Sequence, residues 1–145
     1  PAPGTTMAQL DTQARALIAG ADTFFIATAH PDALHSDDPI AGVDVSHRGG
    51  PAGFVRVQDA STLLVPDYVG NSFFNTLGNL QLEPRCALLF IDFGSGERLH
   101  VQAHGDVLWD AAQRDAFPGA LRVLRLVVSE ATRVVGGLPL QWLPA

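Results

Sequence analysis

The chain has 145 residues, a length typical of one domain, so we expect a single domain over residues 1–145 with a flexible lead at 1–6. Apolar residues make up 47% of the chain and charged residues 17%, which favours a folded protein with a core over a disordered one. The chain has nine arginines and no lysine, so chemistry that needs a lysine, such as a Schiff base, is excluded.

Charge and cysteine content narrow the function classes further. The net charge of −6 argues against a nucleic-acid partner, because phosphate neutralisation drives that kind of binding. Cys86 is the only cysteine, which excludes a disulfide within the chain and agrees with a reducing cytoplasm. The sequence has no apolar run of about 18 residues and no signal-peptide pattern. We therefore expect a cytoplasmic protein without a membrane partner.

The first half of the chain predicts one helix followed by strands. The helix is expected from a cap at Thr5 or Thr6 to about Ala19, since apolar residues recur there at helical spacing. A polar loop rich in proline and aspartate is expected from His30 to Gly42. Apolar or alternating patterns predict strands at 24–29, 44–47, 54–58 and 62–65, the last two as a hairpin.

The second half predicts a further helix and three strands. Asn71 or Ser72 is a suitable cap for a helix that ends near Leu82, before Pro84. Polar and apolar side chains alternate in residues 98–107, which is typical of a strand with one buried face. The remaining predictions are strands at 87–93 and 121–128 and a short helix at 110–116.

These elements indicate a mainly β protein with peripheral helices. The pattern gives six or seven strands, several of them joined by hairpin turns, and this favours an antiparallel barrel or sandwich. A parallel α/β sheet is disfavoured, because most strands lack the crossover helix that parallel pairing requires.

Three segments contain residue types that suit an anionic or planar ligand. The run Ser46–Gly50 offers a hydroxyl, an imidazole, a guanidinium and an open glycine backbone. The predicted helix start at Asn71 and Ser72 would present unpaired N–H groups to an anion. The strand at 98–107 has five polar side chains on one face. Each segment also has a purely structural interpretation, as a turn, a capped helix and a solvent-facing strand.

Other types of site are not supported by the sequence. The loop residues His30, Asp32, His35, Asp37 and Asp38 are of metal-binding types, but their spacing matches no zinc motif, and we predict no metal site. The chain has no Gly-x-Ser-x-Gly nucleophile motif and no Gly-x-Gly-x-x-Gly dinucleotide motif. Cys86 begins an apolar run and is expected to be an inert core thiol.

Two longer stretches resemble a known family. Residues 44–55, DVSHRGGPAGFV, are similar to the DxSxRGGPPGFV segment of pyridoxamine 5′-phosphate oxidase-like proteins. Residues 66–80, PDYVGNSFFNTLGNL, are similar to the PDxxGNxxxNTLGNL segment of that family. An acid-Pro-Arg step at 83–85 and an apolar strand follow, and residues 96–101 are similar to GxRLRV. The resemblance covers residues 22–110.

The resemblance implies an FMN-binding split β-barrel. Two subunits of such a protein pack as a homodimer, and each flavin lies at the subunit interface. A basic residue on a hairpin strand, here Arg56, would hold the phosphate together with polar residues around the following helix start. The implied cofactor-binding residues at the ring edge are Ser46, His47, Arg48 and Gly49. Those at the phosphate are Arg56, Asn71, Ser72, Asn75, Thr76 and Asn79. Arg98 and His100 would contact either the ring or the phosphate, and in one arrangement they come from the partner subunit.

The expected function is that of an FMN-dependent oxidoreductase with a small-molecule substrate, in which the flavin carries the hydride chemistry. No catalytic side chain is assigned. Two alternatives remain open: a flavin-binding or sensing module without turnover, and a split-barrel reductase that binds a deazaflavin or haem. Haem would need an axial histidine from the set His30, His35, His47, His100 and His104.

Overall fold

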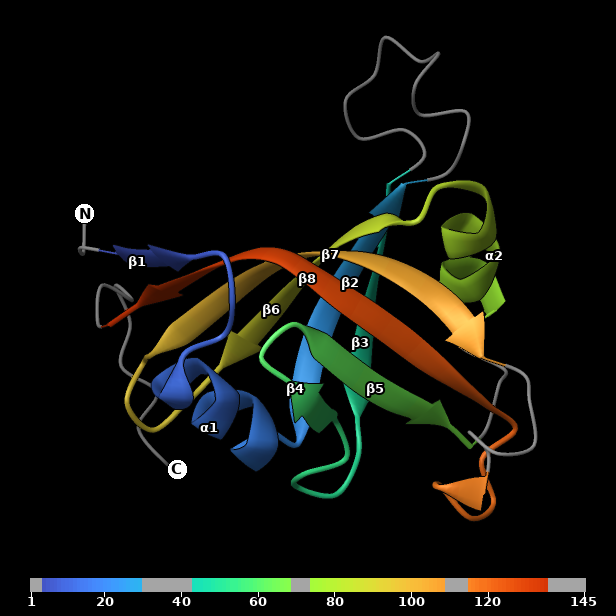
Figure 1. The fold of residues 1–145 in the computed structure, drawn as a ribbon, viewed down its shortest axis with the longest axis horizontal. Helices are drawn as coiled ribbons and strands as arrows, with labels where there is room; N and C mark the ends of the chain where they lie inside the picture. Colours follow the sequence, from blue (N-terminus) through green and yellow to red (C-terminus); the bar gives the residue numbers. More distant parts are fainter. Residues whose placement is uncertain (1–3, 30–42, 69–73, 109–114, 136–145) are drawn as a thin grey trace, which may run out of the picture.

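A computed structural model describes residues 4–29, 43–68, 74–108 and 115–135, and these form eight strands and two helices (Figure 1). In chain order the elements are β1 (Gly4–Met7), α1 (Thr12–Gly20), β2 (Thr23–Ala29), β3 (Val43–Gly49), β4 (Arg56–Asp59), β5 (Thr62–Asp67), α2 (Phe74–Leu82), β6 (Arg85–Ile91), β7 (Arg98–Leu108) and β8 (Arg122–Val134).

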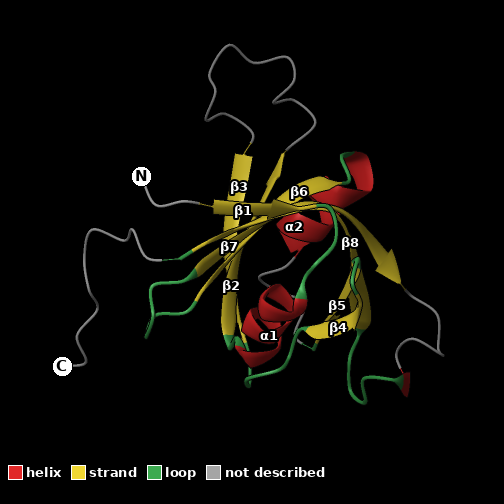
Figure 2. Ribbon diagram, turned by 60° about the vertical axis from the view of Figure 1, so that its left-hand side comes forward, coloured by secondary structure: helices red, strands yellow, loops and turns green. Residues whose placement is uncertain are grey.

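All strand pairs of the described residues are antiparallel, which confirms the predicted mainly β fold. The strand order is β3-β2-β6-β7-β8-β5-β4, and β1 adds to β8. The strands curve around a common interior, with β3 at one end of this order and β4 at the other (Figure 2). Arg48 of β3 nevertheless lies 3.8 Å from Asp67 of β5, so side chains bridge the seam of the split barrel.

The barrel interior is filled by alternate residues of the strands. On β7 the odd-numbered residues Leu99, Val101 and Ala103 are buried, whereas the even-numbered ones from His100 to Asp106 are exposed, as their alternation predicted. Phe24 packs between the rings of Phe54 and Phe90, with centroids 5.8 and 5.4 Å away. Cys86 is buried as expected, and its burial raises the pKa of the thiol to about 12.

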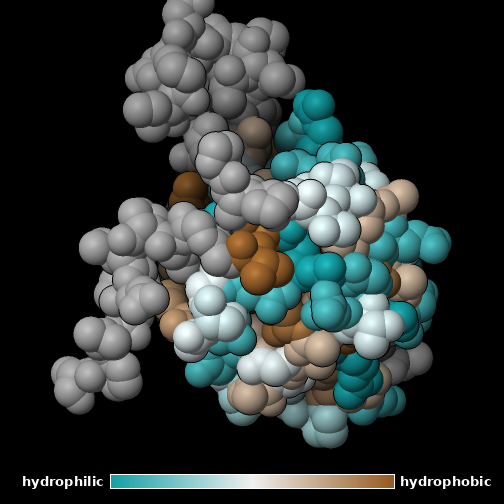
Figure 3. All heavy atoms as spheres, turned by 90° about the vertical axis from the view of Figure 1, so that its left-hand side faces the viewer, coloured by the Kyte–Doolittle hydropathy of each residue, from teal (hydrophilic) through white to brown (hydrophobic). Residues whose placement is uncertain are grey.

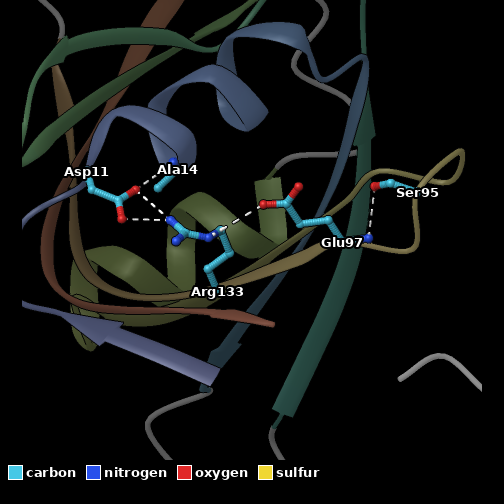
Figure 4. Close-up of polar contacts among 5 residues, drawn as sticks. All are labelled: Asp11, Ala14, Ser95, Glu97 and Arg133. Carbon is cyan, nitrogen blue, oxygen red and sulfur yellow. Dashed lines mark hydrogen bonds and ion pairs between the residues drawn. The ribbon is translucent and has the colours of Figure 1, made fainter. Parts of the chain in front are cut away.

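Helix α1 begins later than the sequence predicted. Its cap is Asp11, whose carboxylate accepts a hydrogen bond from the Ala14 N–H at 2.8 Å. Thr5 and Thr6, the expected caps, lie in β1, because backbone pairing with β8 extends the chain there. Arg133 of β8 binds the same Asp11 carboxylate and faces Glu97, so one guanidinium attaches the helix to the barrel (Figure 4).

Helix α2 lies away from α1, over the other end of the sheet (Figures 1 and 2). Leu77 and Leu80 are buried, as the helical spacing predicted. A Cβ at Gly105 of β7 would lie 3.1 Å from a methyl group of Leu80, so the helix packs closely on the strand at this glycine. Thr76 and Asn79 are also buried, and Asn79 Nδ2 donates to Thr28 Oγ1 at 3.1 Å. Polar and apolar side chains of α2 therefore both face the sheet, Leu80 toward β7 and Asn79 toward β2.

The described surface seen from the side of β1 and the β6–β7 turn is largely hydrophilic, with separate hydrophobic patches (Figure 3). No helix among the described residues is long and apolar enough to span a membrane.

Candidate functional site

Strand β3 is at one end of the sheet order and carries polar side chains on its inner face. Asp44, Ser46 and Arg48 pair in register with Thr28, Ile26 and Phe24 of β2, which are all buried. Cross-strand partners point to the same side of a sheet, so these three polar residues face the barrel interior. The side chains are half-buried. The inner edge of β3 is therefore a polar wall beside an apolar core.

A hydroxyl cluster joins this wall to α2. The Oγ atom of Ser46 lies 3.0 Å from Oγ1 of Thr76, and each hydroxyl also donates to Oδ2 of Asp44, at 3.3 and 3.5 Å respectively. Thr76 is 1% exposed, so its hydroxyl points into the protein and not to solvent. The Asp44 carboxylate holds both hydroxyls in place, and the cluster fixes α2 against the edge strand.

A charged cluster adjoins Arg48, the inward-facing residue of β3 that follows Ser46. Asp67, at the end of β5, is fully buried and forms an ion pair with Arg122 of β8 at 2.8 Å. The Arg48 guanidinium approaches the other Asp67 oxygen at 3.8 Å. Burial lowers the pKa of Arg48, and the negative charge of Asp67 opposes that effect. Arg48 stays protonated, because arginine does not lose its proton in proteins.

Several predicted ring-edge residues face the opposite way. His47 lies on the outer face, bonded to Thr23 Oγ1 at 2.9 Å, with its ring centroid 5.5 Å from that of Phe25. Gly49 is also exposed. Arg98 and His100 belong to the outer face of β7, and His100 shares a register row with Leu89. Within one chain the structure thus separates these residues from Ser46, Arg48, Thr76 and Asn79, which it brings together inside.

Arg56, the predicted phosphate ligand, lies on β4 apart from the hydroxyl cluster. Its Nη2 atom donates to the Ala116 carbonyl at 3.4 Å, and its guanidinium carbon is 4.1 Å from the centre of the Phe117 ring. The side chain is exposed, so it remains accessible to a ligand.

The remaining predicted residues fall outside the described part of the chain. Asn71 and Ser72 lie in the undescribed segment 69–73, as does the helix start they were expected to form, and the side chain of Asn75 is not described either. The same holds for the histidines and aspartates of the loop 30–42 and for most of the predicted helix at 110–116. Among the described residues no group of three or more His, Cys, Asp or Glu side chains is placed to hold a metal ion.

The sequence reasoning did not identify Asp44, Asp67 or Arg122 as site residues. Asp67 follows the buried run Leu63–Pro66, and Arg122 precedes the apolar residues of β8, so both look like the polar ends of strands. The strand alternation could have identified them, because every second residue of a strand faces the same side. Asp67 continues the inward series of Leu63 and Val65, and Arg122 continues that of Leu124.

Comparison with known proteins gives one family and a set of similar folds. The family described as pyridoxamine 5′-phosphate oxidase matches residues 10–134. No curated protein matches the chain. HupZ of Group A Streptococcus has a similar structure, with a TM-score of 0.64 and 13% identity over 88% of this chain and 99% of HupZ.

Two similar structures are named for a flavin. An FMN-binding protein from Syntrophomonas wolfei has a TM-score of 0.59 and 11% identity, over 86% of this chain and 85% of its own. An FAD-binding protein from Mesorhizobium loti has a TM-score of 0.57 and 15% identity, over 92% of this chain and 99% of its own. At these identities the likeness concerns the fold.

Proposed function

Because this chain belongs to the pyridoxamine 5′-phosphate oxidase family, we propose that it binds FMN and acts as a flavin-dependent oxidoreductase on a small molecule. The names of two structural neighbours, an FMN-binding and an FAD-binding protein, support a flavin as the ligand. A bound flavin supplies the hydride or electron transfer, and the protein supplies binding and orientation. We place the protein in the cytoplasm, in agreement with its single cysteine, a buried thiol.

The observation that carries the proposal is the polar inner wall of β3. The hydroxyls of Ser46 and Thr76 lie 3.0 Å apart, and Arg48 is the next inward residue of the same strand. The pyrimidine edge of a flavin presents carbonyl oxygens and ring nitrogens, which the guanidinium of Arg48 can bind. The Ser46 and Thr76 hydroxyls already donate to Asp44, so they hold the wall in place beside that guanidinium. The wall therefore offers the ring edge of a flavin a donor group without any lysine.

The phosphate end is assigned to another part of the molecule. Arg56 is exposed, and a guanidinium suits a phosphate because it can form two parallel hydrogen bonds. Its contacts with Ala116 and Phe117 would orient the side chain before the ligand binds. We assign Asn71, Ser72 and Asn75 to accompany it at the phosphate, whereas Thr76 and Asn79 are buried and contact Ser46 and Thr28.

We further propose that the functional unit is a homodimer that uses the outer face of β3, β2, β6 and β7. Val45 is 66% exposed on this face, and Phe25 and Leu89 beside it are only half-buried. A second copy would cover this apolar area and bring its own Arg98 and His100 toward a shared flavin. His47 and Gly49 would then contact the same interface from the first copy.

The first test is a spectrum of the purified protein, followed by mass spectrometry of the ligand released by heat. We expect flavin absorbance and released FMN, and FMN added to the apoprotein should bind. Anaerobic trials with reduced nicotinamides and other donors then ask which of them bleaches the flavin. A colourless protein that does not bind added FMN contradicts the proposal. A Soret band or a deazaflavin spectrum would replace FMN with that cofactor, and bound FMN that no donor bleaches would indicate a binding module.

A further inference from the structure

Asp67 is a fully buried carboxylate that sits between two arginines from different strands. Arg122 is its register partner on β8, and Arg48 reaches it from β3, across the seam of the barrel. Asp67 has 0% exposed area, and its two oxygens make ion pairs in place of well-aligned hydrogen bonds to other described residues. The Leu121 N–H donates to the Asp67 carbonyl at 2.8 Å, so the backbone is held as well.

Stability alone is a weak reason for this arrangement. The desolvation free energy of a buried ion pair largely cancels its Coulomb attraction, and proteins with apolar replacements of similar volume are often as stable. The three groups together carry one net positive charge beside Arg48, while the Asp44 carboxylate of the same strand is held at the hydroxyl cluster. Arg48 is the most accessible member, with 16% of its side chain exposed, compared with 10% for Arg122 and 0% for Asp67. The positive charge is therefore presented to a ligand through Arg48.

We propose that Asp67 and Arg122 are positioning residues for Arg48, and that together they set the net charge that a bound flavin ring meets at the edge of β3. This inference rests on the proposed function and names two further residues of that site. Arg122 holds the carboxylate from one side, and the carboxylate then orients the Arg48 guanidinium from the other. Neither Asp67 nor Arg122 needs to touch the ring.

The charge assignment predicts opposite effects of two variants on the reduction potential of bound flavin. Two electrons and one proton convert the oxidised ring into an anion, so nearby positive charge favours the reduced form. Asp67→Asn removes a negative charge and should raise the potential. Arg122→Gln removes a positive charge and should lower it. We expect each shift to be about 30 mV or more, which corresponds to a tenfold change in the equilibrium of a two-electron couple.

The experiment uses the intact chain loaded with FMN or with riboflavin, which lacks the phosphate. Dissociation constants come from fluorescence titration, potentials from equilibration with a reference dye, and folding is checked by thermal unfolding. Asp67→Asn should weaken both ligands by about tenfold, the size of one charge-assisted hydrogen bond. Asp11→Asn is the matched control, because it breaks the partly exposed ion pair with Arg133 at the start of α1 and should leave both readouts unchanged.

The outcomes separate this inference from the proposed function. If the wild-type protein binds neither ligand, the proposed function fails and this inference fails with it. If the wild type binds FMN but folded Asp67→Asn matches it in affinity and potential, only the inference is overturned. Potential shifts of the same sign in Asp67→Asn and Arg122→Gln would also overturn it. A charge effect requires opposite signs, whereas loosened packing shifts the potential in the same direction in both variants. Should Asp67→Asn fail to fold, an unchanged potential in Arg122→Gln overturns the inference by itself.

Discussion

Arg133 and Asp11 are 122 residues apart in the chain, yet Nη1 of Arg133 donates to both carboxylate oxygens of Asp11, at 2.7 and 2.6 Å. The same carboxylate caps α1 through the Ala14 N–H (Figure 4). The Arg133 side chain is 11% exposed, whereas that of Asp11 is 42% exposed. One carboxylate thus starts the helix and attaches it to the last strand of the barrel.

This double role predicts two different losses of stability. Asp11→Ala removes the cap and the ion pair, and we expect the free energy of unfolding to fall by about 1–2 kcal/mol. Asp11→Asn keeps a good capping residue but loses the charge opposite Arg133, so its loss should be smaller. Urea unfolding of the three proteins at neutral pH measures both effects. Equal losses in the two variants would show that the cap contributes nothing.

The Asp11 pair also predicts a pH dependence. The Ala14 hydrogen bond, and after it the hydrogen bond from Arg133, lower the pKa of Asp11 below its ordinary value of 3.8. A carboxyl whose pKa is lower in the folded state stabilises the protein above its unfolded pKa, and this contribution is lost as the pH falls through the folded pKa. The stability difference between wild type and Asp11→Asn should therefore be largest at neutral pH and shrink below about pH 4. A difference that is constant from neutral to acidic pH contradicts this assignment.

Two glycines predict opposite effects of the same substitution. A Cβ at Gly105 would lie 3.1 and 3.2 Å from the methyl groups of Leu80, so Gly105→Ala should destabilise the protein by about 1–3 kcal/mol. Gly78 lies within α2 and has no atom within 4 Å of an added Cβ. Gly78→Ala should stabilise the protein by about 0.5–1 kcal/mol, because alanine loses less backbone conformational entropy than glycine when the helix forms. Thermal unfolding of both variants tests the packing of α2 on β7, and stabilisation by Gly105→Ala would contradict it.

The fold was largely predictable because its signals are local. The alternation in 98–107 predicted β7, and the apolar runs predicted β2 and β6 within a few residues. Strand β1 could not be predicted this way, since GTTM has no alternating pattern and its pairing with β8 uses the backbone of residues more than 100 positions away. The late start of α1 has the same origin, because β1 takes up the residues expected to cap the helix.

The candidate site was less predictable, for a geometric reason. Ser46, His47 and Arg48 are consecutive, and adjacency suggested that they face one ligand. In a strand successive side chains point to opposite faces, so His47 is on the outer face while the other two are on the inner one. Asp67 and Arg122 meet only through the pairing of β5 with β8, and a single sequence does not specify that pairing.

The assignment of Arg56 to the phosphate predicts a loss that depends on the ligand. Arg56→Ala should raise the dissociation constant for FMN by about tenfold or more, because one charge-assisted contact to phosphate is removed. The affinity for riboflavin should stay the same, since riboflavin has no phosphate. This pattern is the complement of the one expected for Asp67→Asn, which acts at the ring and should weaken both ligands.

The matched control for this prediction is Arg125→Ala, which removes another partly exposed arginine, one that pairs with Asp106 on the β7–β8 ladder. It should change neither dissociation constant, so a general effect of lost positive charge can be recognised. Loss of the Phe117 contact in Arg56→Ala is expected to cost only about 0.5–1 kcal/mol of stability at this exposed position, which leaves the protein folded for titration. An equal loss of FMN and riboflavin affinity in folded Arg56→Ala would place this arginine away from the phosphate and assign the anion to other residues.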